Sequence, residues 1–113
     1  MTFKVLSLFS GCGGMDLGIE GGFSFLGKKY SKTPFQINQA IDFDPRVVKI
    51  YNKNFDLNCE LKDILDTPNS FFKKHDVLIG GFPCQSFSIS AQNPKRLGYK
   101  DKKGKLFFEI CRV

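Results

Sequence analysis

Residues 3–14 read FKVLSLFSGCGG, and this stretch decides the fold. Its first seven residues are almost continuously apolar, which is typical of a strand buried on both faces of a parallel sheet. Glycines then allow a sharp turn, and the apolar side chains of Met15, Leu17 and Ile19 indicate a short helix, which the next glycine pair ends. A strand, a glycine-rich turn and a helix in this order predict an α/β fold whose turn can approach a ligand closely.

The rest of the chain continues the alternation of strands and helices. We expect further strands over residues 35–41, 57–61 and 76–80, a helix with Asp44 as its N-cap and Pro45 at its first position, and a last helix over 104–113. Residues 24–34 carry three Lys and are expected to form a surface connection. The alternation predicts a parallel, doubly wound α/β sheet with right-handed crossovers. Because the sheet has few strands for such a fold, we expect the sequence to be the front portion of a longer protein.

Two helices are expected to turn apolar faces toward this sheet. The first begins at Asp44, and its apolar face is formed by Val47, Val48, Ile50, Tyr51 and Phe55. The second is the last helix, whose apolar side chains need a partner surface that this chain is not expected to provide in full: Leu106, Phe107, Phe108, Ile110 and Val113.

The composition narrows the class of protein. At 113 residues the chain is one domain or less, and a hydrophobic content of 42% excludes a disordered chain. Lys and Arg outnumber Asp and Glu by 17 to 11, so the net charge of +6 favours a polyanionic partner. Six of the basic side chains lie within residues 95–105 beside a single acid. A solvated basic loop is the alternative interpretation of that run.

The cysteines and the hydropathy pattern predict a reducing compartment. The four cysteines form no C-x-x-C pair and the chain has one His, so we expect neither a metal site nor a redox dithiol. No apolar run is long enough for a signal peptide or for a membrane span of about 18 residues. We therefore expect free thiols, a cytoplasmic location and no membrane partner.

The glycine-rich turn and two acids suggest a nucleoside site. The turn lacks the Gly-Lys-Ser/Thr of a phosphate-binding loop, and Asp16 stands where a G-x-G-x-x-G fingerprint would have its third glycine. Asp42 ends the second strand and can accept hydrogen bonds from ribose hydroxyls, while Asp63 follows the third strand and can face an adenine amino group. The alternatives are a turn without a ligand and acids that cap helices or lie on the surface. Together, two acids at strand ends favour an adenosine-like ligand.

A cysteine-containing loop follows the strand at 76–80. Residues 80–88 read GGFPCQSFS, so Cys84 lies at the same edge of the sheet as the glycine-rich turn. A thiolate there is a nucleophile that needs no metal. His75 begins the preceding strand, and at about 3.3 Å per residue it lies roughly 16 Å away, which argues against a Cys–His dyad. The alternative is a buried, unreactive thiol.

Five motifs, in order, resemble those of the DNA (cytosine-5-)-methyltransferases. They are LFSGCGG (8–14), AIDFDP (40–45), KDI (62–64), GFPCQSFS (81–88) and KKGKLFFEI (102–110). The fourth is nearly identical to the most specific signature of that family. The resemblance covers almost the whole chain and implies a Rossmann-like, S-adenosylmethionine-dependent methyltransferase sheet that is incomplete at its C-terminus. Residues 1–113 would be the N-terminal part of the catalytic domain, without the target recognition domain.

The resemblance also implies a role for individual residues. Cys84 would attack carbon 6 of a cytosine flipped out of double-stranded DNA, and carbon 5 would then accept the methyl group. The residues implied to bind S-adenosylmethionine are Phe9, Ser10, Gly11, Cys12, Gly13, Gly14, Asp42, Phe43, Asp63, Ile64, Phe82 and Leu106. Those implied to contact DNA are Pro83, Gln85, Ser88, Ser90 and Lys103, with the basic run 95–105 meeting phosphates. A restriction–modification system is the expected setting.

The chain also departs from the family pattern. The family's Glu-Asn-Val motif, whose Glu protonates nitrogen 3 of cytosine, has no counterpart among the glutamates Glu20, Glu60 and Glu109. Lys105 replaces a residue that is commonly small, which leaves contacts there open. We therefore expect the chain to be inactive alone and to need a complementing C-terminal chain. The alternatives are a non-catalytic nucleotide- or nucleic-acid-binding α/β module and an NAD-linked oxidoreductase, the latter disfavoured by Asp16.

Overall fold

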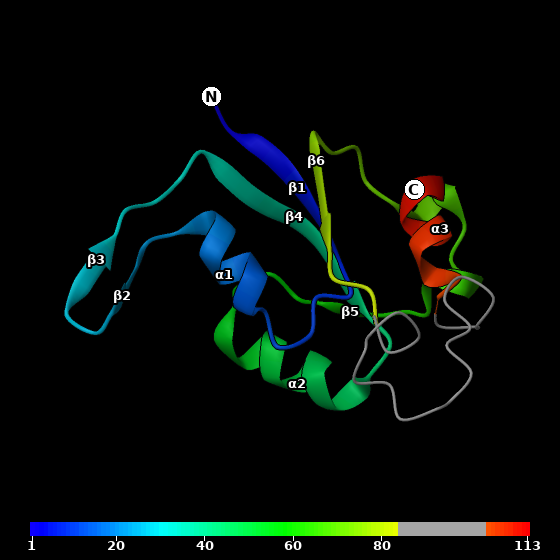
Figure 1. The fold of residues 1–113 in the computed structure, drawn as a ribbon, viewed down its shortest axis with the longest axis horizontal. Helices are drawn as coiled ribbons and strands as arrows, with labels where there is room; N and C mark the ends of the chain where they lie inside the picture. Colours follow the sequence, from blue (N-terminus) through cyan, green and yellow to red (C-terminus); the bar gives the residue numbers. More distant parts are fainter. Residues whose placement is uncertain (84–103) are drawn as a thin grey trace.

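A computed structural model describes residues 1–83 and 104–113 of the chain (Figure 1). Its elements, in chain order, are β1 (Phe3–Leu8), α1 (Gly14–Glu20), β2 (Phe23–Phe25), β3 (Lys28–Tyr30), β4 (Phe35–Asp42), α2 (Pro45–Asn54), β5 (Glu60–Leu61), the 3-10 helices η1 (Ile64–Asp66) and η2 (Asn69–Phe71), β6 (Val77–Gly80) and α3 (Leu106–Arg112). Within the described ranges, none of the helices has the length and apolar character needed to span a lipid bilayer.

The main sheet is parallel, which confirms the predicted fold class. Its strand order is β5-β4-β1-β6, and β1 pairs in parallel with both β4 and β6. The chain moves outward from β1 to β4 and β5 and then returns to the other side of β1, so the strand order reverses between β1 and β6. Open α/β sheets bind ligands outside the carboxyl ends of their strands, at such a reversal.

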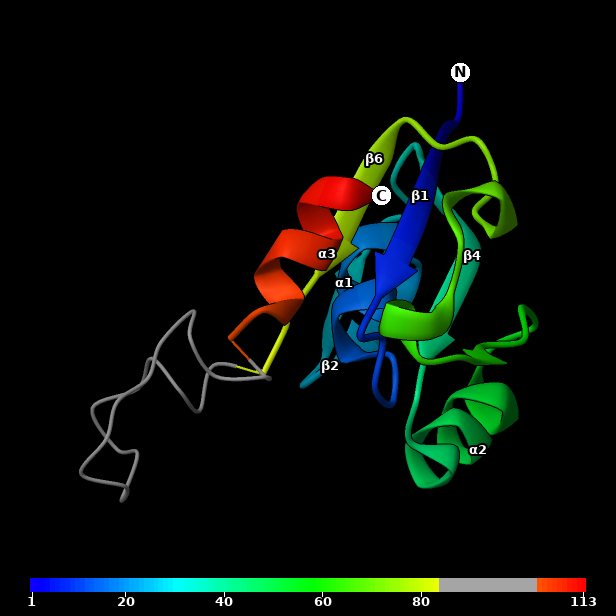
Figure 2. The ribbon, with the colours of Figure 1, turned by 90° about the vertical axis from the view of Figure 1, so that its right-hand side faces the viewer.

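Both faces of β1 are buried, as its apolar run predicts. Successive side chains of a strand point to opposite faces, and Val5 and Leu6 accordingly belong to different core clusters. The Val5 cluster includes Tyr51 of α2, and α1 and α2 lie on that side of the sheet in Figure 1. The Leu6 cluster includes Ile64 of η1, and α3 covers this other face (Figure 2). Helices α1 and α2 on one face and α3 on the other make the sheet doubly wound.

The segment predicted as a surface connection lies on the surface, and part of it forms an antiparallel hairpin. Phe23–Phe25 pairs with Lys28–Tyr30, and the rings of Phe23 and Tyr30 stack with centroids 4.9 Å apart. Leu26 and Gly27 join the strands with φ of 48° and 76°, the positive values that a tight two-residue hairpin turn requires. The surface position was predicted, whereas the hairpin was not, because each of its strands is only three residues long.

Helix α2 begins as predicted, although its apolar face is narrower. The Asp44 carboxylate accepts a hydrogen bond of 2.9 Å from the N–H of Arg46, and Pro45 is the first helical residue. Val48 and Tyr51 are buried, but Ile50, which was predicted to belong to the apolar face, is 48% exposed. The helix rotates about 100° per residue, which turns Ile50 about 200° away from Val48 and out of the core-facing stripe.

The third predicted strand is also shorter than expected. Only Glu60–Leu61 pairs with β4, opposite Ile41 and Asp42. The preceding backbone N–H, that of Cys59, donates to Oδ1 of Asn52 at 2.6 Å. This side-chain bond takes the place of a backbone bond to a neighbouring strand. The segment that leaves α2 therefore joins the sheet only at Glu60 and Leu61.

Helix α3 is held against the sheet by apolar contacts and by Arg112. Three of its predicted apolar side chains, Leu106, Ile110 and Val113, pack on the Leu6 cluster. The other two, Phe107 and Phe108, are 45% and 53% exposed, which agrees with the expectation that this chain covers the helix incompletely.

Arg112 bonds α3 to both 3-10 helices. Its guanidinium donates to the carbonyl oxygen of Ile64 at 2.8 Å, to Oδ1 of Asn69, and to the Glu109 carboxylate at 2.6 Å. The planar guanidinium can make these bonds in different directions at the same time. The end of α3 is therefore fixed to the segment that follows β5.

Replacing Arg112 by Ala should lower the free energy of unfolding by about 1–3 kcal/mol, because two elements lose shared hydrogen bonds. Urea unfolding followed by circular dichroism measures the change. Arg46→Ala is the matched control, since the Arg46 side chain is 87% exposed and pairs with Asp44 beside its own helix. Its unfolding midpoint should barely move. Equal effects of the two variants would show that the Arg112 contacts contribute no stability.

Candidate cofactor site

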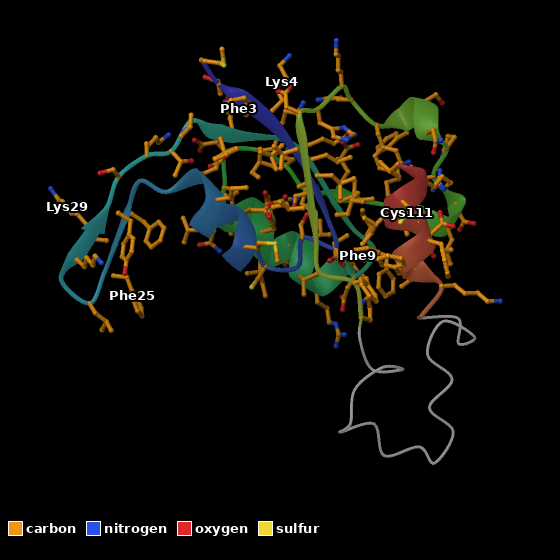
Figure 3. All side chains as sticks on the ribbon, turned by 45° about the horizontal axis from the view of Figure 1, so that its top comes forward. Phe3, Lys4, Phe9, Phe25, Lys29 and Cys111 are labelled. Atoms are coloured by element: carbon orange, nitrogen blue, oxygen red, sulfur yellow. The ribbon has the colours of Figure 1, made fainter. Side chains whose placement is uncertain are left out.

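A cavity lies at the carboxyl end of the sheet, where the strand ends meet. Its volume is about 220 Å³. Figure 3 shows Phe9 at this end of β1, away from Phe25 and Lys29 of the hairpin. The residues that line the cavity are Phe9, Ile41, Asp42, Phe43, Lys62, Asp63, Ile64, Leu65 and Leu106. Six of the residues predicted to bind the cofactor are among them: Phe9, Asp42, Phe43, Asp63, Ile64 and Leu106.

The turn after β1 leaves the sheet abruptly. Phe9 has φ of 53°, a left-handed conformation that is unusual for a bulky residue and that ends the strand one residue before the predicted limit. Gly11 follows with φ of 59°. The N–H of Ser10 donates to the carbonyl oxygen of Ile41 at 3.1 Å, which fixes the turn against β4. Phe9 is thereby directed to the cavity wall.

Asp42 joins this turn to the start of α2. One carboxylate oxygen accepts from the N–H of Gly11 at 2.9 Å, and the other accepts from the N–H of Asp44 at 2.9 Å. Each carboxylate oxygen can accept more than one hydrogen bond, so these contacts are compatible with the predicted bonds to ribose hydroxyls. The sequence placed Asp42 at the strand end, but its bond to the Gly11 backbone depends on the parallel neighbour and carries no local sequence signal.

The opposite wall of the cavity comes from the segment after β5. Asp63 caps η1 by accepting from the N–H of Leu65 at 3.0 Å, so the helix-cap alternative for this residue is realised. Ile64 is 4% exposed and closes the floor, whereas Phe43 and Leu65 are 63% and 44% exposed. A flat apolar ring could lie against such side chains, with carboxylates within reach of its polar atoms.

The glycines of the turn have different structural roles. Gly13 has φ of 95°, and a side-chain Cβ there would lie 2.3 Å from a ring carbon of Phe55. Gly13 therefore permits the turn to pack on α2. A Cβ on Gly11 or Gly14 would meet no atom within 4 Å, and Cys12 is exposed. The turn thus keeps open space on the side away from α2.

A buried polar network lies beneath the turn. The carboxylate of Asp16 is completely buried, and it accepts from the hydroxyls of Ser7 and Tyr51, each at 2.6 Å. The Ser7 and Ser10 hydroxyls are 2.8 Å apart. Burial and the bond to Asp16 raise the pKa of Tyr51 well above its usual value. Burial, together with the carboxylates of Asp42 and Asp16, raises the pKa of the nearby Cys59 thiol to about 12.

Sequence reasoning missed this network. It used Asp16 only as an argument against a dinucleotide fingerprint, because an acid in the first turn of a helix usually faces solvent. Tyr51 lies 35 residues later, so the sequence around Asp16 does not indicate that Tyr51 is its hydrogen-bonding partner. The visible signal was that Tyr51 sits on the apolar stripe of α2, where its hydroxyl needs a hydrogen-bonding partner.

Comparison with known proteins gives the family. Residues 3–113 match the family described as C-5 cytosine-specific DNA methylase. The chain belongs to this family.

Several curated relatives are bacterial enzymes. The chain is 37% identical over 110 residues to Type II methyltransferase M.FnuDI of Fusobacterium nucleatum, which covers 97% of this chain and 28% of that relative. It is 37% identical over 111 residues to Type II methyltransferase M1.ScrFI of Lactococcus lactis subsp. cremoris. That match covers 98% of this chain and 25% of the relative. It is 34% identical over 110 residues to Type II methyltransferase M.HhaI of Haemophilus parahaemolyticus. That match covers 97% of this chain and 29% of the relative. The chain thus spans less than a third of the length of these relatives.

Membership of the C-5 cytosine-specific DNA methylase family confirms the resemblance seen in the motifs. It agrees with the parallel α/β sheet, which is Rossmann-like. The motif GFPCQSFS (81–88) begins in the described residues. Phe82 follows β6 and packs on Phe107 of α3 with ring centroids 5.7 Å apart, and Pro83 is half-buried. The predicted nucleophile Cys84 and the predicted DNA contacts Gln85, Ser88, Ser90 and Lys103 lie outside the described residues.

In residues 1–83 and 104–113, no three His, Cys, Asp or Glu side chains gather as a metal site requires. The Nδ1 atom of His75 lies 3.0 Å from the carbonyl oxygen of Lys73, at the opposite end of β6 from residue 84. Most of the basic run, residues 95–103, also lies outside the described part of the chain.

Gly13→Ala should reduce the free energy of unfolding by about 2–4 kcal/mol, because the new methyl group meets Phe55 and the left-handed backbone disfavours Ala. Thermal unfolding measures the loss. Gly14→Ala is the matched control: it lies at the start of α1 with open space around its Cβ, and it should leave stability unchanged or raise it slightly. If both variants behave alike, Gly13 has no packing role.

Proposed function

We propose that residues 1–113 form the N-terminal part of the catalytic domain of a DNA cytosine-5 methyltransferase. The whole protein would transfer a methyl group from S-adenosylmethionine to carbon 5 of cytosine in double-stranded DNA, within a restriction–modification system. The observation that carries the proposal is the cavity between Phe43 and η1, at the carboxyl end of the sheet and at the same edge as the end of β6, in a chain of this family. The relatives' names, Type II methyltransferase, support the assignment.

The cavity fits the adenosine part of S-adenosylmethionine. Its 220 Å³ is below the usual range of about 300–1,000 Å³ for small-molecule sites, so it suits a nucleoside rather than the whole cofactor. Phe43 would stack on the adenine, Asp63 would accept from its amino group, and Asp42 would accept from the ribose hydroxyls. The methionine part would extend over Gly11 and Gly14, where a Cβ would meet no neighbour. When bound, the cofactor supplies a methyl group on a positively charged sulfur.

Cys84 would activate the cytosine. Its thiolate adds to carbon 6, and the electron pair of the 5,6 double bond then makes carbon 5 nucleophilic enough to take the methyl group. Loss of the proton from carbon 5 expels the thiolate and restores the double bond. The base must leave the DNA helix to reach this position, and phosphate contacts from residues 95–105 would hold the DNA backbone.

The acid that protonates nitrogen 3 must come from another part of the protein. Glu20 accepts from the N–H of Ile37 at 2.8 Å, and Glu109 pairs with Arg112 at 2.6 Å. Glu60 lies 3.3 Å from the side-chain amide of Gln39. The three glutamates of this chain thus have structural partners. We propose that the acid and the sequence-reading surface lie C-terminal to this region, in the same or a complementing chain, and that residues 1–113 alone do not methylate DNA.

Phe43→Ala should weaken binding of S-adenosylmethionine by about tenfold, the usual loss for removing an aromatic ring from beneath a base. Its stability should change little, because Phe43 is already 63% exposed. Isothermal titration calorimetry with the 113-residue chain measures the affinity. Ile50→Ala, which removes a 48% exposed side chain on α2, should bind like the parent chain. Equal affinity of the Phe43→Ala variant and the parent would contradict the stacking role.

The nucleophile can be tested in a chimera. Residues 1–113 would replace the matching region of the Fusobacterium nucleatum relative, which supplies the remaining length. We expect this chimera to transfer tritiated methyl groups to DNA and to form a covalent adduct with 5-fluorocytosine DNA, and we expect Cys84→Ser to abolish both. Methyl transfer that survives Cys84→Ser would exclude the nucleophile assignment. A folded chimera that binds cofactor and DNA without adduct formation would favour the non-catalytic binding module.

A further inference from the structure

Asp16 carries a buried charge that the proposed reaction does not use. Its side chain is completely inaccessible, and it lies in α1 directly after the glycine-rich turn. Both carboxylate oxygens are occupied, one by the Ser7 hydroxyl and the other by the Tyr51 hydroxyl, each at 2.6 Å. Both partners donate, which is the arrangement that an ionised carboxylate requires because it can only accept.

No cation neutralises this carboxylate within the described part of the chain. The ion pairs there join Arg46 to Asp44 and Arg112 to Glu109, and neither involves Asp16. Removing a charge from water is costly unless an opposite charge compensates it. Two hydroxyl donors offset part of that cost, but they leave a net negative charge inside the protein. A cationic ligand at the adjacent turn would supply the missing compensation.

The charge lies close to the turn over which the cofactor would bind. Ser7 links Asp16 to Ser10 of the turn through contacts of 2.6 and 2.8 Å. Ser10 is 9% exposed, so mainly protein rather than water separates the carboxylate from the turn. Charges interact more strongly through protein than through water. Burial, and then the carboxylates of Asp42 and Asp16, raise the pKa of the neighbouring Cys59 thiol.

We propose that Asp16 is a specificity-determining residue whose buried negative charge favours a positively charged sulfonium cofactor over its uncharged thioether product. This inference rests on the proposed function. The two ligands have nearly the same shape and differ by one methyl group and one positive charge. A fixed negative charge therefore discriminates between them without contacting either, and it favours release of the product after methyl transfer.

The alternative is that Asp16 only holds α1, β1 and α2 together. A structural role predicts that changes at Asp16 weaken all ligands alike, because the whole turn shifts. A charge role predicts a selective loss of the positively charged ligands. The ratio of the dissociation constants of a charged and an uncharged ligand separates these roles. A general loss of binding raises both constants alike and leaves their ratio unchanged.

The experiment measures binding of three ligands to the 113-residue chain by calorimetry. They are S-adenosylmethionine, sinefungin, in which a protonated amine replaces the sulfonium, and S-adenosylhomocysteine, which is uncharged at that position. Asp16→Asn should weaken the first two by about tenfold and the third by less than about twofold. Tyr51→Phe removes a hydrogen bond but keeps the charge, so its ligand ratios should match those of the parent chain.

A second pair of variants guards against misfolding of Asp16→Asn. Asp16→Leu combined with Tyr51→Phe replaces Asp16 and its Tyr51 partner with apolar side chains of similar shape, which is better tolerated than leaving Tyr51 unpaired. The Ser7 hydroxyl keeps its contact with the Ser10 hydroxyl. Compared with Tyr51→Phe alone, the double variant should show the same selective loss. Equal loss for all three ligands, or no loss, would overturn the inference while leaving the proposed function intact. A parent chain that binds none of the ligands would instead contradict the proposed function.

Discussion

Strand β1 forms backbone hydrogen bonds with β4 along one edge and with β6 along the other. This double pairing brings together segments that are far apart in the chain: the glycine-rich turn, the end of β4 at Asp42, and the end of β6. All strands of the sheet are parallel, so their carboxyl ends share one edge. The candidate site therefore needs no special positioning device beyond the sheet itself.

Side-chain hydrogen bonds then fix the loops that leave this edge. The carboxylate of Asp42 holds the backbone of Gly11 and of Asp44, so a single side chain fixes the loops of two adjacent strands. Arg112 similarly joins α3 to the segment that carries Ile64. These contacts cross between elements, and they give the cavity a defined shape although its walls come from distant parts of the sequence.

The parts of the fold that local chemistry dictates could be predicted from the sequence. The apolar run of β1, the Asp44-Pro45 start of α2 and the strand before Gly80 are signalled within a few residues. The hairpin was missed because its alternation is only three residues long on each side of Leu26-Gly27. The start of β5 was misplaced because Asn52, in α2, accepts the hydrogen bond of the Cys59 backbone N–H. In each case a short or non-local interaction overrode the local pattern.

The candidate site shows the same division. Six residues implied by the family motifs line the cavity, because motifs at strand ends map directly onto the shared edge of a parallel sheet. The buried set of Asp16, Ser7 and Tyr51 could not be foreseen, since it combines residues from β1, α1 and α2 whose meeting depends on tertiary packing. The packing role of Gly13 was missed for the same reason, because Phe55 contacts it from across the α1–α2 layer.

The position of β1 also has a consequence for the order in which the protein folds. β1 comes first in the sequence but lies between β4 and β6, so its two edges are completed at different times during synthesis. β4 is available once residue 42 has been made, whereas the partner of Val5 on the other edge is Val77. Closing so long a loop is entropically costly and slow. Until β6 arrives, the edge of β1 that later pairs with β6 keeps its backbone N–H and C=O groups unpaired, so the β6 side of the sheet is completed last.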